Sequence, residues 1–296
     1  MEDIMQPTLS LTHGRLNAVQ QQQYWDDGFL FPLPALSPQE AQQYRQEIEA
    51  IEQHWLDNGL PLPLNTYKRI NAHVVMPMVA QIAMHPAILD VVEGILGPDI
   101  MIFSGEFFIK EAQTKQIVSM HQDLTYWGLG AIDGLVTAWI PLSPATPESG
   151  CMDFVRGSHK DAILPHQDTF DENNLLSRGQ EVNVDVSDDQ KTAIEIHPGQ
   201  MSLHHGLTIH GSGPNQSDDR RIACVIRYLR PDMAQQVGEK DYAMMARGED
   251  RHGNFIHVPP PTENFGADAM ALYDEIRIAQ SKVMMKGTDG KTEMYA

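Results

Sequence analysis

Cysteine and basic residues are scarce in this sequence. Its 296 residues include two cysteines, Cys151 and Cys224, which are too few for a disulfide framework and fit a reducing compartment. Only 21 Lys and Arg stand against 40 Asp and Glu, a formal net charge of −19. Because phosphate groups and anionic lipids are bound by basic surfaces, this balance argues against nucleic acid and membrane partners.

Long apolar runs are also lacking. None approaches the roughly 20 residues needed to cross a bilayer, and the acidic start Met1-Glu2-Asp3 does not have the order of a signal peptide. We therefore expect a cytoplasmic protein. The composition leaves its oligomeric state open.

The first third of the chain predicts helices. Ser37-Pro38-Gln39-Glu40 combines an N-cap Ser, a Pro at the first helical position and a Glu for a capping box, so a helix is expected from there to about Asn58. A second helix is expected between His85-Pro86 and Gly97-Pro98, and a shorter one over residues 20–26. Near the C-terminus, residues 242–251 and 267–281 are expected to be helical or irregular.

The middle of the chain predicts strands, because short β-prone segments alternate with Gly, Pro, Asp and Ser turns. The candidates are residues 99–109, 135–140, 151–155, 181–186, 193–196, 201–203, 207–209 and 222–229. We predict a mainly β fold with flanking helices and a double-stranded β-helix core, the jelly roll of cupin-like proteins. The chain would be a single domain over residues 1–296, with a helical N-terminal part (about 15–97), a jelly-roll core (about 98–231) and a C-terminal wrapping segment (232–296).

The motif His121-Gln122-Asp123 carries most of the chemical information. On an extended strand, side chains alternate between two faces, so His121 and Asp123 would point the same way. With His210 they would form a triad of two His and one carboxylate, which leaves three positions of an octahedral ion open and is characteristic of non-haem Fe(II) oxygenases. The spacing alone is weak in a chain with 13 His, and a polar surface strand would show it too.

Two further features support a metal-dependent site. His205 and His210 are an odd number of residues apart, so on a regular strand only one of them can face the metal. Arg220 and Arg221 precede an apolar strand, and an arginine there can hold a dicarboxylate through two hydrogen bonds. The other arginine would lie at a solvated strand end.

The sequence resembles the phytanoyl-CoA dioxygenase family of Fe(II)/2-oxoglutarate-dependent oxygenases, over roughly Gln23 to Pro231. The matching segments keep the family's order and spacing: His121-Gln122-Asp123, Thr137-Ala138-Trp139, Glu148-Ser149-Gly150-Cys151-Met152, Gly157-Ser158-His159-Lys160 and His205-Gly206-Leu207-Thr208-Ile209-His210-Gly211-Ser212-Gly213, with the trailing arginines. Arg156 departs from the pattern, which usually has Pro before Gly-Ser-His.

The resemblance implies the following cofactors and roles. His121, Asp123 and His210 would bind Fe(II), and 2-oxoglutarate and O2 would be consumed. The cosubstrate 2-oxoglutarate would be held by Arg221, with Arg220 as the alternative, and by Ser212 and Trp139. The resemblance also offers Lys68 or Arg69 as the counterpart of a basic residue near the cosubstrate in some members.

The implied reaction is hydroxylation of an unactivated C–H bond of a small polar metabolite or natural-product intermediate, with release of succinate and CO2. Halogenation is disfavoured, because halogenating relatives have a small residue where this chain has Asp123. Five residues beside the metal strand are candidates for substrate binding: Gln122, Tyr126, Trp127, Gln113 and Ser119. The alternatives are a non-catalytic jelly-roll binding protein and a Zn- or Mn-dependent hydrolase that uses the same ligands.

Overall fold

The structure is a computed structural model of the chain, and it describes residues 7–57, 59–125, 127–130 and 133–285. The helices are α1 (Ala18–Asp27), α2 (Pro38–Trp55), α3 (Leu64–Arg69), α4 (Ala72–Val75), α5 (Pro77–Ala83), α6 (Pro86–Leu96) and α7 (Ala267–Met284). The strands are β1 (Phe29–Pro34), β2 (Ile100–Lys110), β3 (Val118–His121), β4 (Leu135–Pro141), β5 (Met152–Val155), β6 (His166–Asp168), β7 (Gln180–Val182), β8 (Lys191–Ile194), β9 (Gln200–His205), β10 (His210–Ser212), β11 (Arg221–Leu229), β12 (Tyr242–Arg247) and β13 (Ile256–His257).

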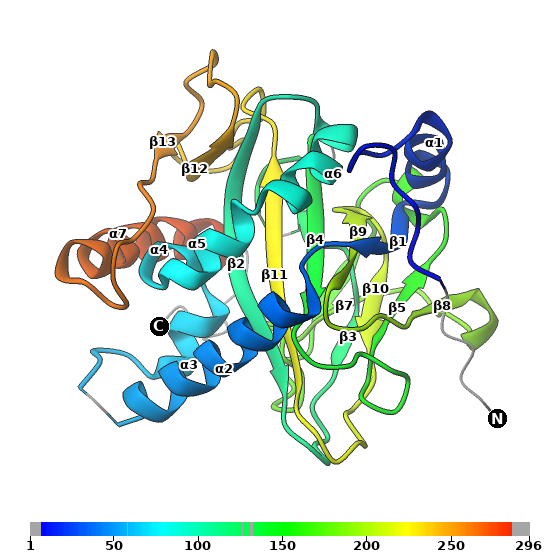
Figure 1. Cartoon of the computed structure of the whole chain (residues 1–296), viewed down its shortest axis with the longest axis horizontal. Coiled ribbons are helices and arrows are strands. Elements are labelled where there is room, and N and C mark those ends of the chain that lie inside the picture. Colours follow the sequence, from blue (N-terminus) through cyan, green and yellow to red (C-terminus); the bar gives the residue numbers. More distant parts are fainter. Residues whose placement is uncertain (1–6, 58, 126, 131–132, 286–296) are drawn as a thin grey trace.

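Two sheets make up the jelly-roll core (Figure 1). The major sheet has the strand order β1-β9-β4-β11-β2-β12-β13, and the minor sheet has the order β3-β10-β5-β8. Helices α3, α4 and α5 pack on β2, and α6 packs on β4, so the helices cover the major sheet. The predicted mainly β fold with flanking helices and a jelly-roll core is confirmed.

Strand β11 shows how the sheet separates two cores. All nine of its residues are buried, and it pairs antiparallel with both β2 and β4. Ile222 and Ile226 pack among the helices, whereas Ala223 and Val225 pack between the sheets, against Trp139. The period-two alternation of a strand therefore directs one set of β11 side chains into the space where the two sheets meet.

The helix signals in the sequence agree with the structure. Ser37 caps α2 in a capping box with Glu40, and α6 has Pro86 at its first position and ends at Gly97. Helix α7 covers the predicted helix at 267–281. Among the described residues, no single helix is long and apolar enough to cross a membrane; α5 and α6 pass that test only as a pair bent by 52°.

Two predictions of local structure are wrong. Residues 207–209 are not a strand: β9 ends at His205, and the chain turns there to pass from the major sheet to β10 of the minor sheet. Residues 242–247 are not helical: β12 pairs with β2 and gives that strand its second neighbour. Tyr242 and Met244 face one core cluster and Ala243 faces another, which is the alternation of a strand.

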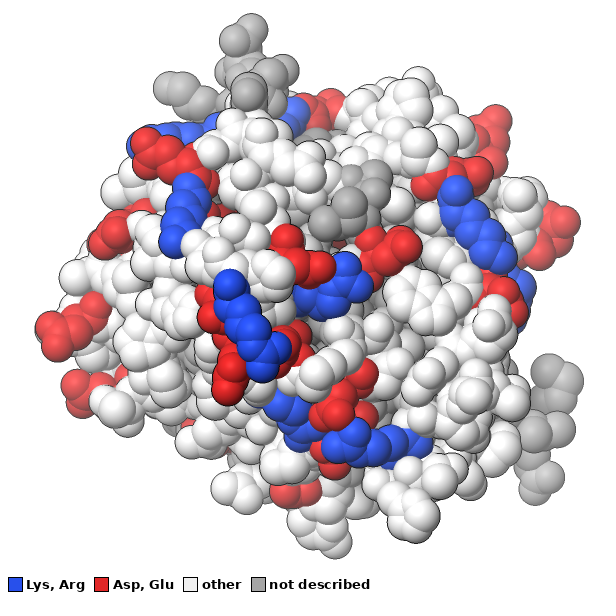
Figure 2. Space-filling view, turned by 90° about the horizontal axis from the view of Figure 1, so that it is seen from above, with Lys and Arg blue, Asp and Glu red and all other residues white. Residues whose placement is uncertain are grey.

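Charged residues of both signs are interspersed on the surface. On the face seen in Figure 2, Lys and Arg side chains lie scattered among Asp and Glu side chains.

Candidate metal centre

His121 and His210 face each other across a pair of antiparallel strands. They are register partners in β3 and β10, and their ring centroids are 4.2 Å apart. Each ring has Nδ1 at 2.9 Å from the backbone carbonyl oxygen two residues earlier, of Ser119 and Thr208. A hydrogen bond from Nδ1–H fixes the tautomer that leaves Nε2 available to a metal.

Asp123 joins the two histidines, but not in the way the sequence predicts. Strand β3 ends at His121, and Asp123 begins a short 3-10 turn over Asp123–Thr125, so the two ligands do not share one face of a strand. The turn brings Asp123 Oδ1 to 3.4 Å from His121 Nε2. One ligand atom from each of His121, Asp123 and His210 lies within 4.8 Å of the others, and all three residues are buried.

A row of residues across the major sheet faces the second oxygen of Asp123. Thr137 of β4 is the register partner of both His204 in β9 and Arg227 in β11. Thr137 Oγ1 donates to Asp123 Oδ2 at 3.1 Å, and Arg227 Nε donates to the same oxygen at 3.4 Å. These contacts leave Oδ1 as the oxygen that faces the histidines.

The protonation states suit a metal site. Burial acts to raise the pKa of Asp123, but the neighbouring imidazoles of His121, His204 and His210 outweigh it and hold that pKa well below its ordinary value. Burial and the neighbouring histidines hold the pKa of His210 well below 6.5. A carboxylate and a neutral imidazole are the forms that bind metal ions.

A cavity of about 370 Å³ runs from the three candidate ligands to Arg221. Arg221 is 1% exposed, and its guanidinium lies 5.3 Å from the Trp139 ring centroid. Its Nε and Nη2 have no hydrogen-bond partner in the part of the chain that the structure describes. Burial lowers the pKa of Arg221 to about 10, so it stays charged at neutral pH. A buried cation with unused donors calls for an anion, and the carboxylate of 2-oxoglutarate fits this demand.

Ser212 and Lys110 complete that end of the cavity. Lys110 is the register partner of Arg221, and its Nζ donates to Ser212 Oγ at 2.6 Å and to the carbonyl oxygen of Gly213. Burial and the charge of Arg221 lower the pKa of Lys110 to about 6. Lys110 thus fixes the Ser212 hydroxyl on the cavity wall, a role that the sequence did not indicate.

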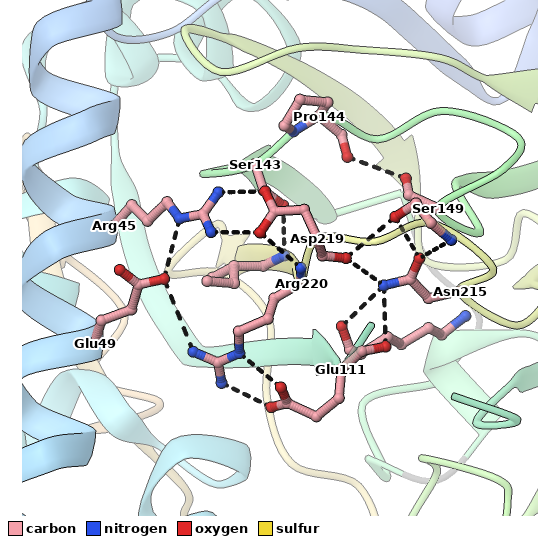
Figure 3. A network of polar contacts seen from close by, with 12 residues as sticks. Arg45, Glu49, Glu111, Ser143, Pro144, Ser149, Asn215, Asp219 and Arg220 are labelled. Atoms are coloured by element: carbon pink, nitrogen blue, oxygen red, sulfur yellow. Dashed lines mark hydrogen bonds and ion pairs between the residues drawn. The ribbon is translucent and has the colours of Figure 1, made fainter. Parts of the chain in front are cut away.

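Arg220 lies outside the cavity. Its guanidinium donates to Glu52 at 2.8 Å and to both carboxylate oxygens of Glu111, each at 2.8 Å. Figure 3 shows this network continuing to Arg45 and Asp219, which pair at 2.6 Å. Of the two arginines left open by the sequence, Arg221 is the one that the structure brings to the candidate ligands.

A second hollow opens on the other side of the metal ligands. It consists of two adjoining cavities of about 520 and 470 Å³, and the first also touches His121 and Asp123. Both are lined by Arg69, Glu106, Trp127, Arg227 and Met284. Arg227 pairs with Glu106 and lies 4.6 Å from the Trp127 ring centroid.

Several of these lining residues were missed by the sequence reasoning. Arg227 and Glu106 alternate correctly on their strands, but no motif marks them. Met284 comes from α7, so the C-terminal segment helps to close this hollow. Arg69 lines this hollow and lies 4.0 Å from the ring centroid of Phe108, which also lines the cavity of Arg221. Lys68 pairs with Glu52 at 2.5 Å.

Of the five predicted substrate-binding residues, Trp127 lines the second hollow. The Gln122 side chain is fully buried, where it donates to the Leu207 carbonyl oxygen and accepts from Leu164 N–H, so it ties loops together. Ser119 bonds to Gln180 and Asn174, and Gln113 bonds to Gln216 and Asp218 on an exposed loop; neither lines the two cavities. Tyr126 lies outside the described residues.

His205 does not face the metal. It is buried on the other side of β9, with Nε2 at 3.2 Å from Asp133 Oδ1. The odd spacing from His210 is therefore not what separates them, because the chain turns between the two residues.

A family model and a curated relative name the same family. The family model described as Phytanoyl-CoA dioxygenase (PhyH) matches residues 24–223. The solved structure of apo ThoJ, a non-heme monooxygenase, is similar with a TM-score of 0.81 and 32% identity, covering 90% of this chain and 97% of that chain. A probable phytanoyl-CoA dioxygenase of Caenorhabditis elegans is 24% identical over 75% of this chain and 78% of its own length. A probable alpha-ketoglutarate-dependent hypophosphite dioxygenase of Stutzerimonas stutzeri is 25% identical over 76% of this chain and 82% of its own length.

Proposed function

Because the chain belongs to the phytanoyl-CoA dioxygenase family, whose cofactors are Fe(II), 2-oxoglutarate and O2, we propose that it hydroxylates an unactivated C–H bond of a small polar metabolite or natural-product intermediate, releasing succinate and CO2. One observation carries the proposal above all. The buried guanidinium of Arg221, with donors unused, shares a cavity with His121, Asp123 and His210.

Each residue that lines the cavity has a proposed role. His121, Asp123 and His210 would hold the iron and leave positions open for the cosubstrate and O2. Arg221 and Ser212 would bind the far carboxylate of 2-oxoglutarate, and Trp139 would pack along its carbon chain. When bound, iron and 2-oxoglutarate supply the oxidising power for C–H cleavage. Phe108 and Val225 on the same wall would keep water away from the reacting atoms.

A polar substrate is supported by the second hollow. Arg69, Glu106 and Arg227 line its inner part, and Asp241 lines its outer part. Arg69 and Arg227 both pair with Glu106, and a hydrocarbon chain would take these paired charges out of contact with water without offering them hydrogen bonds, so it would be a poor occupant. The named relatives differ in this respect, because one takes its name from an acyl-CoA and another from hypophosphite.

The other reactions and roles are less well supported. Asp123 fills the coordination position that a halogenating enzyme would leave to chloride, which favours hydroxylation. A hydrolase needs no dicarboxylate cosubstrate, so it does not account for a buried Arg221 that pairs with no described carboxylate. The complete set of His121, Asp123 and His210 in the same cavity argues against a simple binding protein.

The first test is spectroscopic. Full-length protein mixed with Fe(II) and 2-oxoglutarate without O2 is expected to give a weak visible charge-transfer band. Asp123→Ala should abolish it, and Arg220→Ala should retain it. Absence of the band from folded, metal-loaded protein would overturn the oxygenase proposal.

The second test addresses the reaction. A panel of small polar compounds is screened for substrate-dependent succinate formation, and each hit is repeated with isotopically labelled O2. A product that carries one labelled oxygen atom supports hydroxylation. A product without added oxygen would indicate desaturation or ring chemistry instead.

A further inference from the structure

His204 lines the proposed cosubstrate cavity, although it is not one of the three candidate metal ligands. It stands in β9, is 1% exposed and lines the same cavity as His210 and Arg221. Neither of its ring nitrogens has a hydrogen-bond partner among the described residues. Leaving a buried polar group unsatisfied costs about 1–3 kcal/mol, so such a group calls for a partner that binds in the cavity.

The surroundings of His204 narrow the choice of partner. Its ring packs between Phe154, at a centroid distance of 4.9 Å, and His210, at 4.6 Å. Its Nε2 is 3.7 Å from Asp123 Oδ2, which is too far for a hydrogen bond, and that oxygen already accepts from Thr137 and Arg227. The described residues therefore offer Nε2 no free acceptor at hydrogen-bond distance.

The position of His204 complements that of Arg221. His204 shares a cross-strand row with Thr137 and Arg227, at the level of the candidate metal ligands, whereas Arg221 lies at the opposite end of the cavity. Since Arg221 and His204 line one cavity, a dicarboxylate bound there with one end at Arg221 would direct its other end toward the candidate metal ligands and His204. We propose that His204 is a cosubstrate-binding residue whose N–H donates to the carboxylate next to the keto group of 2-oxoglutarate.

This inference rests on the proposed function. The binding of three acids distinguishes a failure of the inference from a failure of the proposed function. The first is 2-oxoglutarate. Pyruvate keeps the keto group and its adjacent carboxylate but lacks the far carboxylate. Levulinate keeps the keto group and the far carboxylate but has a methyl in place of the adjacent carboxylate. Binding of each acid to the full-length, Ni(II)-loaded protein is measured by calorimetry.

The variants are His204→Phe, which keeps the ring size without hydrogen-bonding atoms, and His204→Gln, which keeps an N–H donor. His204→Phe is expected to weaken 2-oxoglutarate and pyruvate about tenfold, the effect of losing a hydrogen bond to a charged group, and to leave levulinate unchanged. His204→Gln should recover part of the loss. Arg221→Ala should show the opposite selectivity, weakening 2-oxoglutarate and levulinate but not pyruvate.

Two results would overturn the inference. If His204→Phe weakens all three acids equally, or none, His204 does not bind the carboxylate next to the keto group. If it lowers Ni(II) affinity without any acid by as much as it lowers acid binding, His204 only supports Asp123. Failure of the unmodified protein to bind 2-oxoglutarate would instead refute the proposed function, and the inference with it.

Discussion

Arg221→Ala is expected to raise the 2-oxoglutarate requirement about a hundredfold, and Arg220→Ala is expected to leave it unchanged. Removing one partner of a buried charge pair costs about 2–5 kcal/mol. A value of about 3 kcal/mol corresponds to roughly a hundredfold change in affinity, since each 1.4 kcal/mol is a factor of ten. The buried position of Arg221, at 1% exposure, justifies the use of this range instead of that for surface pairs.

The same substitution has an unusual consequence for the unliganded protein. Arg221 makes no ion pair with any described carboxylate, and burial depresses its pKa to about 10. The folded protein therefore bears the cost of an uncompensated charge, which the Ala variant does not. We expect the unliganded Arg221→Ala variant to be no less stable than the parent, apart from the loss of packing against Trp139.

Arg220→Ala is the matched control, since it removes the adjacent arginine on the surface. Its pairs with Glu52 and Glu111 are partly exposed, and such pairs contribute about 0.2–1 kcal/mol each. A small loss of stability with normal cosubstrate binding is the expected result. Stability is measured by urea unfolding, and cosubstrate dependence by titration of the charge-transfer band.

The reverse order of effects for the two arginine variants would refute this prediction. If Arg220→Ala weakens 2-oxoglutarate more than Arg221→Ala does, the cavity between Arg221 and the metal ligands is not the cosubstrate site. An Arg221→Ala variant that is strongly destabilised without ligand would show that the guanidinium has a structural role.

Two further predictions concern the support of the site and of the fold. Thr137→Val removes the hydroxyl that donates to Asp123 Oδ2, and should weaken metal binding about tenfold in a calorimetric titration, whereas Thr137→Ser should not. Burial lowers the pKa of His73 from 6.5 to about 4. As the pH falls, His73 is therefore protonated in the unfolded chain before it is protonated in the folded protein, and the folded protein loses stability between about pH 6.5 and pH 4. Between pH 7 and pH 5, the free energy of unfolding of the parent protein should decrease by about 2 kcal/mol more than that of His73→Leu. Equal decreases in the two proteins would contradict this prediction.

The sequence predicted most of the frame, and the structure brings the residues that it singled out, His121, Asp123, His210 and Arg221, to one cavity. Apolar, β-prone runs bounded by turn residues located β2, β4 and β11, and the capping signals located α2 and α6. What it could not predict depends on contacts between distant segments. Nothing local shows that β12 would pair with β2, or that α7 would place Met284 beside the metal ligands.

Period-two alternation predicts the direction of side chains correctly on a long strand but not on a short one. It placed His121 and Asp123 on one strand face, but β3 has four residues and ends at His121, so a turn sets the carboxylate instead. Gln122, which was predicted to bind substrate because it lies beside the candidate ligands in the sequence, is held by Leu207 and Leu164.

Strand β11 shows the opposite case. It is nine residues long and regular at its start, so Arg221, Ala223, Val225 and Arg227 share one face. Once Arg221 is assigned to the cosubstrate cavity, period two alone places Arg227 on the same wall, where its Nε reaches Asp123. Arg227 connects Asp123 to Glu106 and the second hollow. Its position could therefore have been inferred from the sequence, by counting along the strand from Arg221 in steps of two residues.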